Sequence, residues 1–322
     1  MNTKEIAENI LNNYPLSPVR PLVLVGGCIG DIVATIDSLP SLGSDVSAKI
    51  VDEQIGGCAL NVARVVKKFD LPVVNAMPVG VGKWADCVKE ELNELDLPIN
   101  IQITDRDNGY CLAFVTPDKE RTFVTFEGAE TILRKQDLDK ISVTEDSIVY
   151  LNGYELILEN DLIAWVESIE RAKFVVDFGP VIYNISPSII DMLLQKEDVI
   201  FTLNKDEATF LLGSLGANVI SNYAIKNKIE LVIRMGSEGV ISVDPEGSMQ
   251  YIDALPVEVV DTIGAGDCHT GALIAGISSN LDLASSCLLG NISGAYTVTQ
   301  VGAKNTSPLS NYEKTLKALC DK

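Results

Sequence analysis

The sequence contains a single histidine, His269, and few basic residues. One histidine excludes a metal site built on a histidine pair and a catalytic centre rich in histidine. Lysine and arginine total 25 against 45 aspartates and glutamates, a formal net charge of -20. This charge repels nucleic acid and anionic membranes, so we expect neither as a partner. Any bound phosphate must be held by backbone N–H groups, a metal ion or a few placed cations.

The sequence also lacks paired cysteines and long apolar runs. Its seven cysteines are odd in number, widely spread and never arranged as C-x-x-C, which is typical of reduced thiols in a cytoplasmic protein. No apolar stretch is long enough to span a bilayer, and the acidic N-terminus does not have the order of a secretion signal. We therefore expect a cytoplasmic protein whose chemistry is carried by carboxylates, hydroxyls, amides and backbone.

Short β-branched apolar runs alternate with helix-length segments. With 322 residues, 47% of them hydrophobic, the chain can bury a sizeable core. The alternation predicts an α/β fold with a mainly parallel sheet covered by helices on both faces. Ligands bind beyond the carboxyl ends of such strands, where the sequence places Asp177, Asn204 and Gly236. The runs are at 21–27, 147–153, 173–179, 198–204 and 230–236.

Two stretches, 33–55 and 99–127, break this rhythm with alternating patterning and turn residues. They predict a small antiparallel sheet that projects as a lid, with residues 116–121 as a hairpin connection. No repeat, low-complexity tract or linker divides the chain. We therefore expect residues 1–322 to form one domain with a β lid.

The stretch DTIGAGDCHTGALIAG, residues 261–276, sets glycines and an aspartate before an apolar helical face. The pattern predicts that IGAGD forms the first helical turn, where the N–H groups of Gly264, Ala265 and Gly266 make an anion site. Asp267 at the edge of that site suits a general base that deprotonates an attacking hydroxyl. This stretch alone is more typical of an aspartate that caps a helix behind a tight turn.

A second stretch, GGCALNVARVVKKF at residues 56–69, places two glycines before another amphipathic helix. Gly56 and Gly57 let a small ligand approach the backbone, and Asn61 offers a donor and an acceptor. Taken alone, the pattern is as well explained by close packing of a helix on a sheet.

Together the two stretches resemble the signatures of the PfkB (ribokinase-like) family of carbohydrate and nucleoside kinases, D-T-x-G-A-G-D and G-G-x-x-x-N-x-A. The resemblance runs from about Val23 to Ala303 in the family's order. It implies a three-layer αβα fold with a β-sheet lid and transfer of the γ-phosphoryl group of ATP to a hydroxyl. It further implies that Asp267 is the catalytic base, with Gly264, Ala265 and Gly266 as the anion hole.

Other family positions carry over one at a time. In VGGCIGD the resemblance implies that Asp31 binds substrate hydroxyls beside Gly56, Gly57 and Asn61, although Asp31 alone is also typical of a strand-end turn. The N-x-x-E motif becomes Asn204 and Glu207, which would organise Mg²⁺ and phosphates, with Glu207 acting through water. The nucleotide side would consist of Arg234, Gly236, Gly239 and Asn291. A monovalent cation such as K⁺ would lie near Asp261 and the turn at 301–302.

The chain departs from the family where the substrate is chosen. Arg234 replaces the threonine of T-x-G-x-x-G, and DFGPVIYN lacks the arginine of D-x-N-x-R. We place Asn108 and Arg121 of the lid region near the acceptor, and Trp84 is either a stacking residue or an exposed start of a helix. The pattern is most similar to an uncharacterised sugar-kinase branch. A nucleoside kinase and a silent regulatory relative remain alternatives, and a homodimer through the lid is expected.

Overall fold

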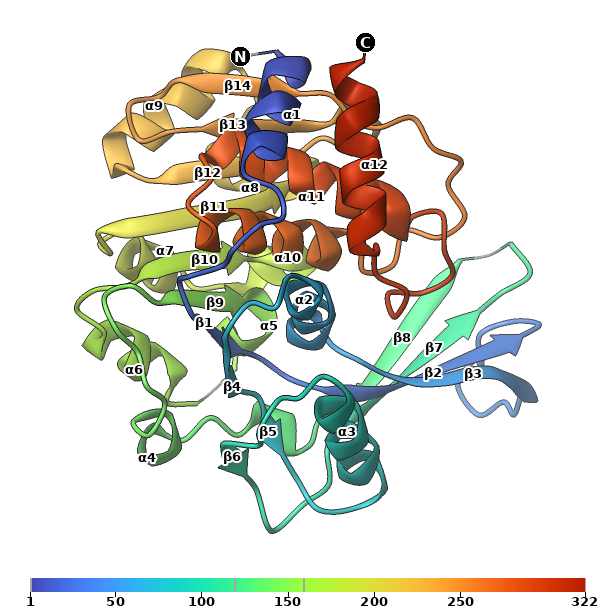
Figure 1. The fold of residues 1–322 in the computed structure, drawn as a ribbon. Coiled ribbons are helices and arrows are strands. Elements are labelled where there is room, and N and C mark those ends of the chain that lie inside the picture. Colours follow the sequence, from blue (N-terminus) through green and yellow to red (C-terminus); the bar gives the residue numbers. More distant parts are fainter. Residues whose placement is uncertain (1, 119, 159, 322) are drawn as a thin grey trace.

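The computed structural model describes residues 2–118, 120–158 and 160–321. Its centre is an eight-stranded sheet in the order β14-β13-β12-β11-β10-β9-β1-β4, in which β12, β13 and β14 are antiparallel and the other neighbours are parallel (Figure 1). All five apolar runs expected to be strands are strands of this sheet, so the predicted α/β class is confirmed. The bounds are β1 (Leu22–Val25), β4 (Val73–Ala76), β9 (Ile148–Asn152), β10 (Lys173–Asp177), β11 (Asp198–Asn204), β12 (Glu230–Arg234), β13 (Val240–Val243) and β14 (Met249–Ile252).

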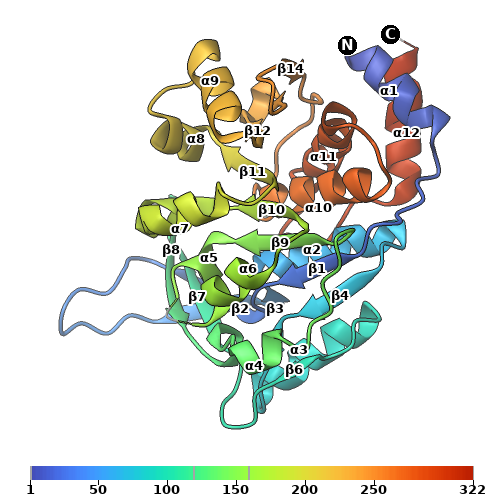
Figure 2. The same cartoon turned by 90° about the vertical axis from the view of Figure 1, so that its left-hand side faces the viewer.

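Helices cover both faces of this sheet, which makes three layers (Figure 2). Because neighbouring side chains of a strand point to opposite faces, Leu22 and Leu24 belong to one core and Val23 and Val25 to the other. One layer contains α1 (Thr3–Asn12), α2 (Cys58–Val66), α10 (Ala265–Ser278), α11 (Leu283–Thr297) and α12 (Leu309–Cys320). The other contains α4 (Lys135–Leu138), α5 (Gly153–Leu156), α6 (Leu162–Ser168), α7 (Pro187–Leu193), α8 (Lys205–Leu212) and α9 (Ala217–Asn227). Among the described residues, no helix is long and apolar enough to cross a membrane.

A second sheet, in the order β3-β2-β7-β8, projects from the body as the lid (Figure 1). It contains β2 (Ile29–Ile36), β3 (Ala48–Gly56), β7 (Tyr110–Val115) and β8 (Arg121–Phe126). The expectation of an antiparallel sheet is corrected, because β2 and β7 run parallel. The chain between β3 and β7 returns through the body, by way of α2, β4, β5 (Pro78–Val79), α3 (Lys83–Glu94) and β6, and so re-enters the lid in the direction of β2.

The lid segments also differ from the predicted ranges. The first part of 99–127 contains β6 (Ile101–Gln102), which pairs with β5 in a separate two-stranded sheet. At the other end, Val115 pairs with Arg121 in the antiparallel ladder of β7 and β8, so residues 116–121 connect a hairpin as expected. Lys119, within that connection, lies outside the described residues.

Candidate active site

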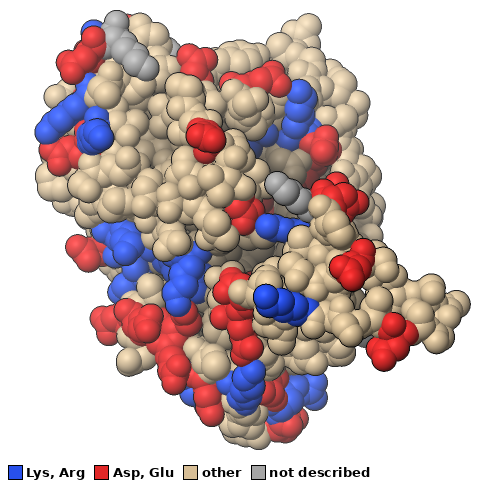
Figure 3. All heavy atoms as spheres, turned by 90° about the vertical axis from the view of Figure 1, so that its right-hand side faces the viewer, with Lys and Arg blue, Asp and Glu red and all other residues tan. Residues whose placement is uncertain are grey.

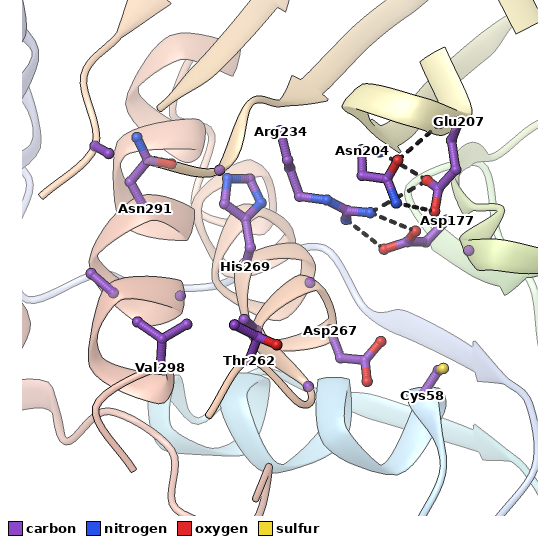
Figure 4. A pocket seen from close by; sticks show the side chains of 18 of the residues that line it. Cys58, Asp177, Asn204, Glu207, Arg234, Thr262, Asp267, His269, Asn291 and Val298 are labelled. Carbon is purple, nitrogen blue, oxygen red and sulfur yellow. Dashed lines mark hydrogen bonds and ion pairs between the residues drawn. The ribbon is translucent and has the colours of Figure 1, made fainter. Parts of the chain in front are cut away.

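A cavity of about 860 Å³ lies where the carboxyl ends of β9 to β12 face the start of α10. This is the edge at which parallel sheets of this kind bind ligands, and the volume is within the usual range for small-molecule sites. The face seen in Figure 3 is hollowed near its centre, and basic side chains there lie among acidic ones rather than in one broad patch. Figure 4 shows side chains from several elements converging on the cavity.

A glycine turn opens α10 at the edge of this cavity. Gly264 has φ +70°, which L side chains rarely adopt, and a Cβ on it would lie 2.2 Å from the Cβ of Ala303. The helix then begins at Ala265, so its first-turn N–H groups and the positive end of its dipole lie at the cavity. The predicted segment Gly264–Gly266 therefore lies at the start of the helix and at the cavity, with the N–H of Ala265 donating to the carbonyl of Thr262 at 3.3 Å.

Asp267, in the first turn of α10, is held by α2. The amide nitrogen of Asn61 donates to the Asp267 carboxylate at 2.8 Å, and the Asn61 oxygen accepts from Arg64 at 2.9 Å. Because the arginine can only donate, it fixes which end of the Asn61 amide faces Asp267. Arg64 is itself buried and anchored by the carbonyl of Ile55 and by Glu91. The hydrogen bond from Asn61 to Asp267 therefore joins the segments that carry the two signatures.

Burial raises the pKa of Asp267 to about 6. The hydrogen bond from Asn61 lowers that pKa, the neighbouring Asp177 carboxylate raises it, and the Cys58 thiol and the Arg234 guanidinium lower it. A carboxylate with such a pKa is mostly ionised at neutral pH and more basic than an ordinary aspartate. Both properties suit a group that removes a proton from a hydroxyl.

Arg234 lies on the floor of the cavity, at the end of β12. It makes a bidentate ion pair with Asp177, at 2.7 and 3.0 Å (Figure 4). It also donates to the hydroxyls of Thr202 at 2.9 Å and Thr270 at 3.1 Å. A Cβ placed on Gly266 would lie 3.6 Å from its Cζ, so the guanidinium lies beneath the glycine turn. The two threonines were missed from the sequence, since they lie on different elements and form no motif.

Asn204 and Glu207 open α8 beside Arg234. The Asn204 side chain accepts from the Glu207 N–H at 2.9 Å, and the Glu207 carboxylate accepts from the Asn204 N–H at 2.8 Å, which makes a capping box. Glu207 is 2% exposed and lies 3.8 Å from Arg234. Within the described chain, no three His, Cys, Asp or Glu side chains are grouped to hold a metal ion.

Two further predicted glycines form the turn after β12. Gly236 has φ +63° and Gly239 has φ +102°, and a Cβ on Gly239 would lie 2.1 Å from the carbonyl oxygen of Ile252. Asn291 of α11 donates to the carbonyl of Asp253 at 3.0 Å and so joins α11 to the segment after β14. All three residues line the cavity. His269 lines it too, with burial lowering its pKa to about 3, and the sequence had offered no role for this neutral imidazole.

The predicted acceptor residues Asp31, Gly56 and Gly57 lie together at the base of the lid. Asp31 is on β2, and a Cβ on Gly56 would lie 1.9 Å from its carboxylate oxygen. Gly57 has φ +116°, and its Cβ would lie 2.3 Å from the carbonyl of Gly27. Glycine is therefore required at both positions, by the Asp31 carboxylate at Gly56 and by the Gly27 carbonyl at Gly57. Burial raises the pKa of Asp31 to about 6, while Arg64 lowers it.

The lid-side predictions fall in other surroundings. The Asn108 amide is buried and bonded to backbone, accepting from Gly80 N–H at 2.8 Å and donating to the carbonyls of Cys28 and Pro78. Arg121 reaches Asp261 rather than Asp31, at 3.4 and 3.5 Å.

The tryptophan at the start of α3 is enclosed. Trp84 is 7% exposed, so the reading of an exposed helix start does not hold. Its ring stacks on Tyr110 at 5.7 Å, and Tyr110 stacks on Phe126 at 4.6 Å. A Cβ on Gly30 would lie 2.3 Å from the Trp84 ring. The three rings join α3 to β7 and β8 of the lid.

Comparison with known proteins bears on this site. The pattern of the pfkB family carbohydrate kinases matches residues 20–309. The uncharacterised sugar kinase YegV of Escherichia coli K12 is 34% identical over 89% of this chain and 91% of its own, and the ribokinase of Lactococcus lactis is 25% identical over 92% and 97%. The structure of Arabidopsis thaliana ribokinase with ribose and ATP superposes with a TM-score of 0.77 at 20% identity, covering 93% of this chain and 99% of that one.

The two signature segments are joined by the hydrogen bond from Asn61 to Asp267, and the family match covers most of the chain. The chain belongs to the pfkB family of carbohydrate kinases and is an ATP-dependent kinase that acts on a hydroxyl group.

Proposed function

We propose that this protein transfers the γ-phosphoryl group of ATP to a hydroxyl of a sugar or a sugar-like metabolite, with Asp267 as the base. The observation that carries the proposal is the meeting of three features at one point. Asp267 is bonded to Asn61, lies in the first turn of α10 beside the Gly264 turn, and lines the cavity that the arginine network floors.

In the proposed reaction, an Asp267 carboxylate oxygen takes the proton of the acceptor hydroxyl while the hydroxyl oxygen bonds to the γ-phosphorus. The bond from that phosphorus to the bridging oxygen breaks, and ADP leaves with the electron pair. The N–H groups of Gly264, Ala265 and Gly266 would stabilise the negative charge that develops on the phosphoryl oxygens, and that of Ala265 would exchange its bond to the Thr262 carbonyl, at 3.3 Å, for a phosphoryl oxygen. The raised pKa of Asp267 helps it to hold the proton.

The nucleotide side fits Mg·ATP with few protein ligands. Glu207 and Asn204 line the cavity, with the Glu207 carboxylate accepting from Asn204, and Mg²⁺ usually keeps several waters and binds phosphate oxygens alongside one or two carboxylates. The ion would neutralise phosphate charge there, with Glu207 holding it through water. The turn at Gly236 and Gly239 and the Asn291 side of the cavity would take the rest of the nucleotide.

The acceptor side favours a sugar. Asp31, Gly57 and Asn61 offer a carboxylate, backbone and an amide, which suit hydroxyl groups. The two rings considered for stacking on a base, Trp84 and Tyr110, stack on each other instead, and Tyr110 also stacks on Phe126. The name of the 34% identical relative, a sugar kinase, supports the same choice. Seven free thiols and the need for ATP favour a cytoplasmic location.

The first experiment measures ADP release with Mg·ATP against pentoses, hexoses, keto-sugars, sugar phosphates and nucleosides. Asp267→Asn should lower the rate on the best acceptor by about a thousandfold, the usual scale for loss of a general base. Asp70→Asn is the matched control, since Asp70 is exposed and has φ +55°, a conformation that asparagine also tolerates. Activity unchanged in Asp267→Asn would refute the role of Asp267. Nucleotide binding with no turnover on any acceptor would favour a regulatory protein.

We also propose a homodimer through the lid. Its strands expose apolar side chains that a second copy would cover: Ile50, Val51, Phe123, Val124 and Phe126. Sedimentation at micromolar concentration should show a dimer, and Phe123→Asp should give monomers. A wild-type monomer in that measurement would exclude this assembly.

A monovalent cation near Asp261, which family resemblance implies, does not fit the residues present. The Asp261 carboxylate accepts from two backbone N–H groups and from Arg121. We therefore assign no step to such an ion.

A further inference from the structure

An arginine of the lid is paired with the aspartate that opens the anion loop. Arg121 is the first residue of β8, and Asp261 precedes the glycine turn of α10. The two guanidinium nitrogens of Arg121 face the two carboxylate oxygens of Asp261 at 3.4 and 3.5 Å. The Asp261 side chain is 9% exposed, so the carboxylate that Arg121 faces is almost buried.

The Asp261 carboxylate has no room for another ligand. One oxygen accepts from the N–H of Ile263 at 3.1 Å and the other from the N–H of Gly302 at 3.1 Å, and each also faces one nitrogen of Arg121. A carboxylate offers about four lone-pair sites, and these four donors fill them. Burial raises the pKa of Asp261, but the two backbone N–H groups and Arg121 outweigh it, so that the pKa is lowered and the group is ionised.

The backbone beside this carboxylate is filled in the same way. The carbonyl oxygen of Val298 accepts from the N–H of Val260 at 2.7 Å and from that of Asp261 at 3.2 Å. A carbonyl has two lone pairs, and both are used. A K⁺ ion bound by the Asp261 carboxylate or by this carbonyl would compete with hydrogen bonds that are already made.

We propose that Arg121 supplies from within the chain the positive charge that an external monovalent cation would bring to this loop, so that the kinase needs no such ion. Arg121 is then a positioning residue, because it acts through Asp261 on the loop that leads to Gly264 and Asp267. Only the expected effect of Arg121 on the reaction rate rests on the proposed kinase function.

This arrangement also ties the anion loop to the lid. Arg121 belongs to the lid sheet, whereas Ile263 and Gly302, bonded to the same carboxylate, belong to the body. Gly302 in turn lies beside Gln54 of β3, 3.5 Å from the Cβ that a side chain there would have. The positive charge of Arg121 is therefore supplied to the anion loop by the lid sheet.

The first test measures binding and does not need an acceptor. Thermal unfolding is followed with and without Mg·ADP in about 0.1 M KCl and in tetramethylammonium chloride at the same concentration, which gives equal screening. Wild type should melt at the same temperature in both salts. Arg121→Gln frees two lone pairs and removes the charge, so it should gain stability specifically from K⁺. Arg171→Gln removes an exposed arginine, paired with Glu145 at 3.7 Å, and serves as the control.

The second test measures ADP release with the acceptor found above. Wild type should change less than about twofold between the two salts, and Arg121→Gln without K⁺ should lose roughly fivefold, the upper range for a partly exposed pair. K⁺ should restore the variant, and Arg121→Lys should lie between the two. A K⁺-specific stabilisation of wild type overturns the proposal, and so does an Arg121→Gln protein that responds to neither removal nor addition of K⁺. If Arg121→Gln does not fold, Arg121→Lys and the wild-type salt comparison decide. If no acceptor is turned over, the kinase function fails while the melting comparison still decides the cation.

Discussion

The pH dependence of the reaction tests the electrostatics of the Arg234 pair. Asp267 has a pKa of about 6, so at pH 7 about nine-tenths of the molecules carry an ionised base. The Arg234 charge lowers this pKa and the Asp177 charge raises it. The two partners of one ion pair should therefore have opposite effects on the base when each is neutralised.

Arg234→Gln removes the cation and leaves Asp177 unpaired, so the acidic limb of the rate should move to higher pH and fewer molecules should carry the ionised base at pH 7. Asp177→Asn removes the like charge and leaves Arg234 unpaired, so the limb should move to lower pH, and by more, because Asp177 raises the pKa of Asp267 more than Arg234 lowers it. The double variant should lie between the two single variants.

The assay is kcat and kcat/KM for the best acceptor from pH 5 to 9. Asp31 has a similar pKa and contributes to the same limb, but its pKa depends on burial, Arg64 and Asp52, which neither substitution changes. Only the part of the limb due to Asp267 should move. Each single variant breaks a buried pair and should lose about 3–5 kcal/mol of unfolding free energy, so melting is checked at every pH. Shifts of the same sign in both variants would refute this account.

Three further predictions follow from buried positions. Burial raises the pKa of Glu155 to about 8, so the stability that its protonated form gives the folded state is complete below about pH 4.5 and is lost as pH rises through 8. The melting temperature of wild type should therefore fall over that window, while that of Glu155→Gln stays level. Gly264→Ala should cost about 1–3 kcal/mol and abolish turnover, whereas Gly179→Ala, with φ +61° and no atom within 4 Å, should cost only the backbone strain. Arg64→Met should raise the KM for the acceptor more than it lowers kcat, since Asn61 loses its fixed orientation; an unchanged KM would contradict this.

The features that the sequence predicted depend on local pattern. The runs at 173–179 and 198–204 have apolar side chains at consecutive central positions, 174–176 and 199–201, because both faces of a parallel sheet are covered, and they form β10 and β11. The glycines at 264 and 57 need backbone that only glycine adopts readily, so their spacing marks two turns. The first turn of α10, and with it Asp267, could be placed from residues that are close in the sequence.

The features that the sequence did not predict depend on partners far away along the chain. The direction of β7 beside β2 follows from a long return through the body, and alternation alone is the same for either direction. An asparagine such as Asn108 has the same pattern whether it binds a substrate or backbone, and only the fold supplies Gly80 and Cys28 as its partners. Trp84 is similar, because the ring that encloses it belongs to the lid.

The source of positive charge in the site can be traced only from the sequence and the fold together. The sequence showed that the arginine of the family's D-x-N-x-R segment is missing after β10 and that Arg234 stands where a threonine is usual. The fold brings Arg234 across β11 to Asp177 at the end of β10, so a cation reaches that strand end from a different strand. Because each such arginine is already paired with a carboxylate, it orders the site but adds little net attraction for phosphate. In a chain of charge -20, we therefore expect attraction for ATP to come chiefly from Mg²⁺ and the first turn of α10.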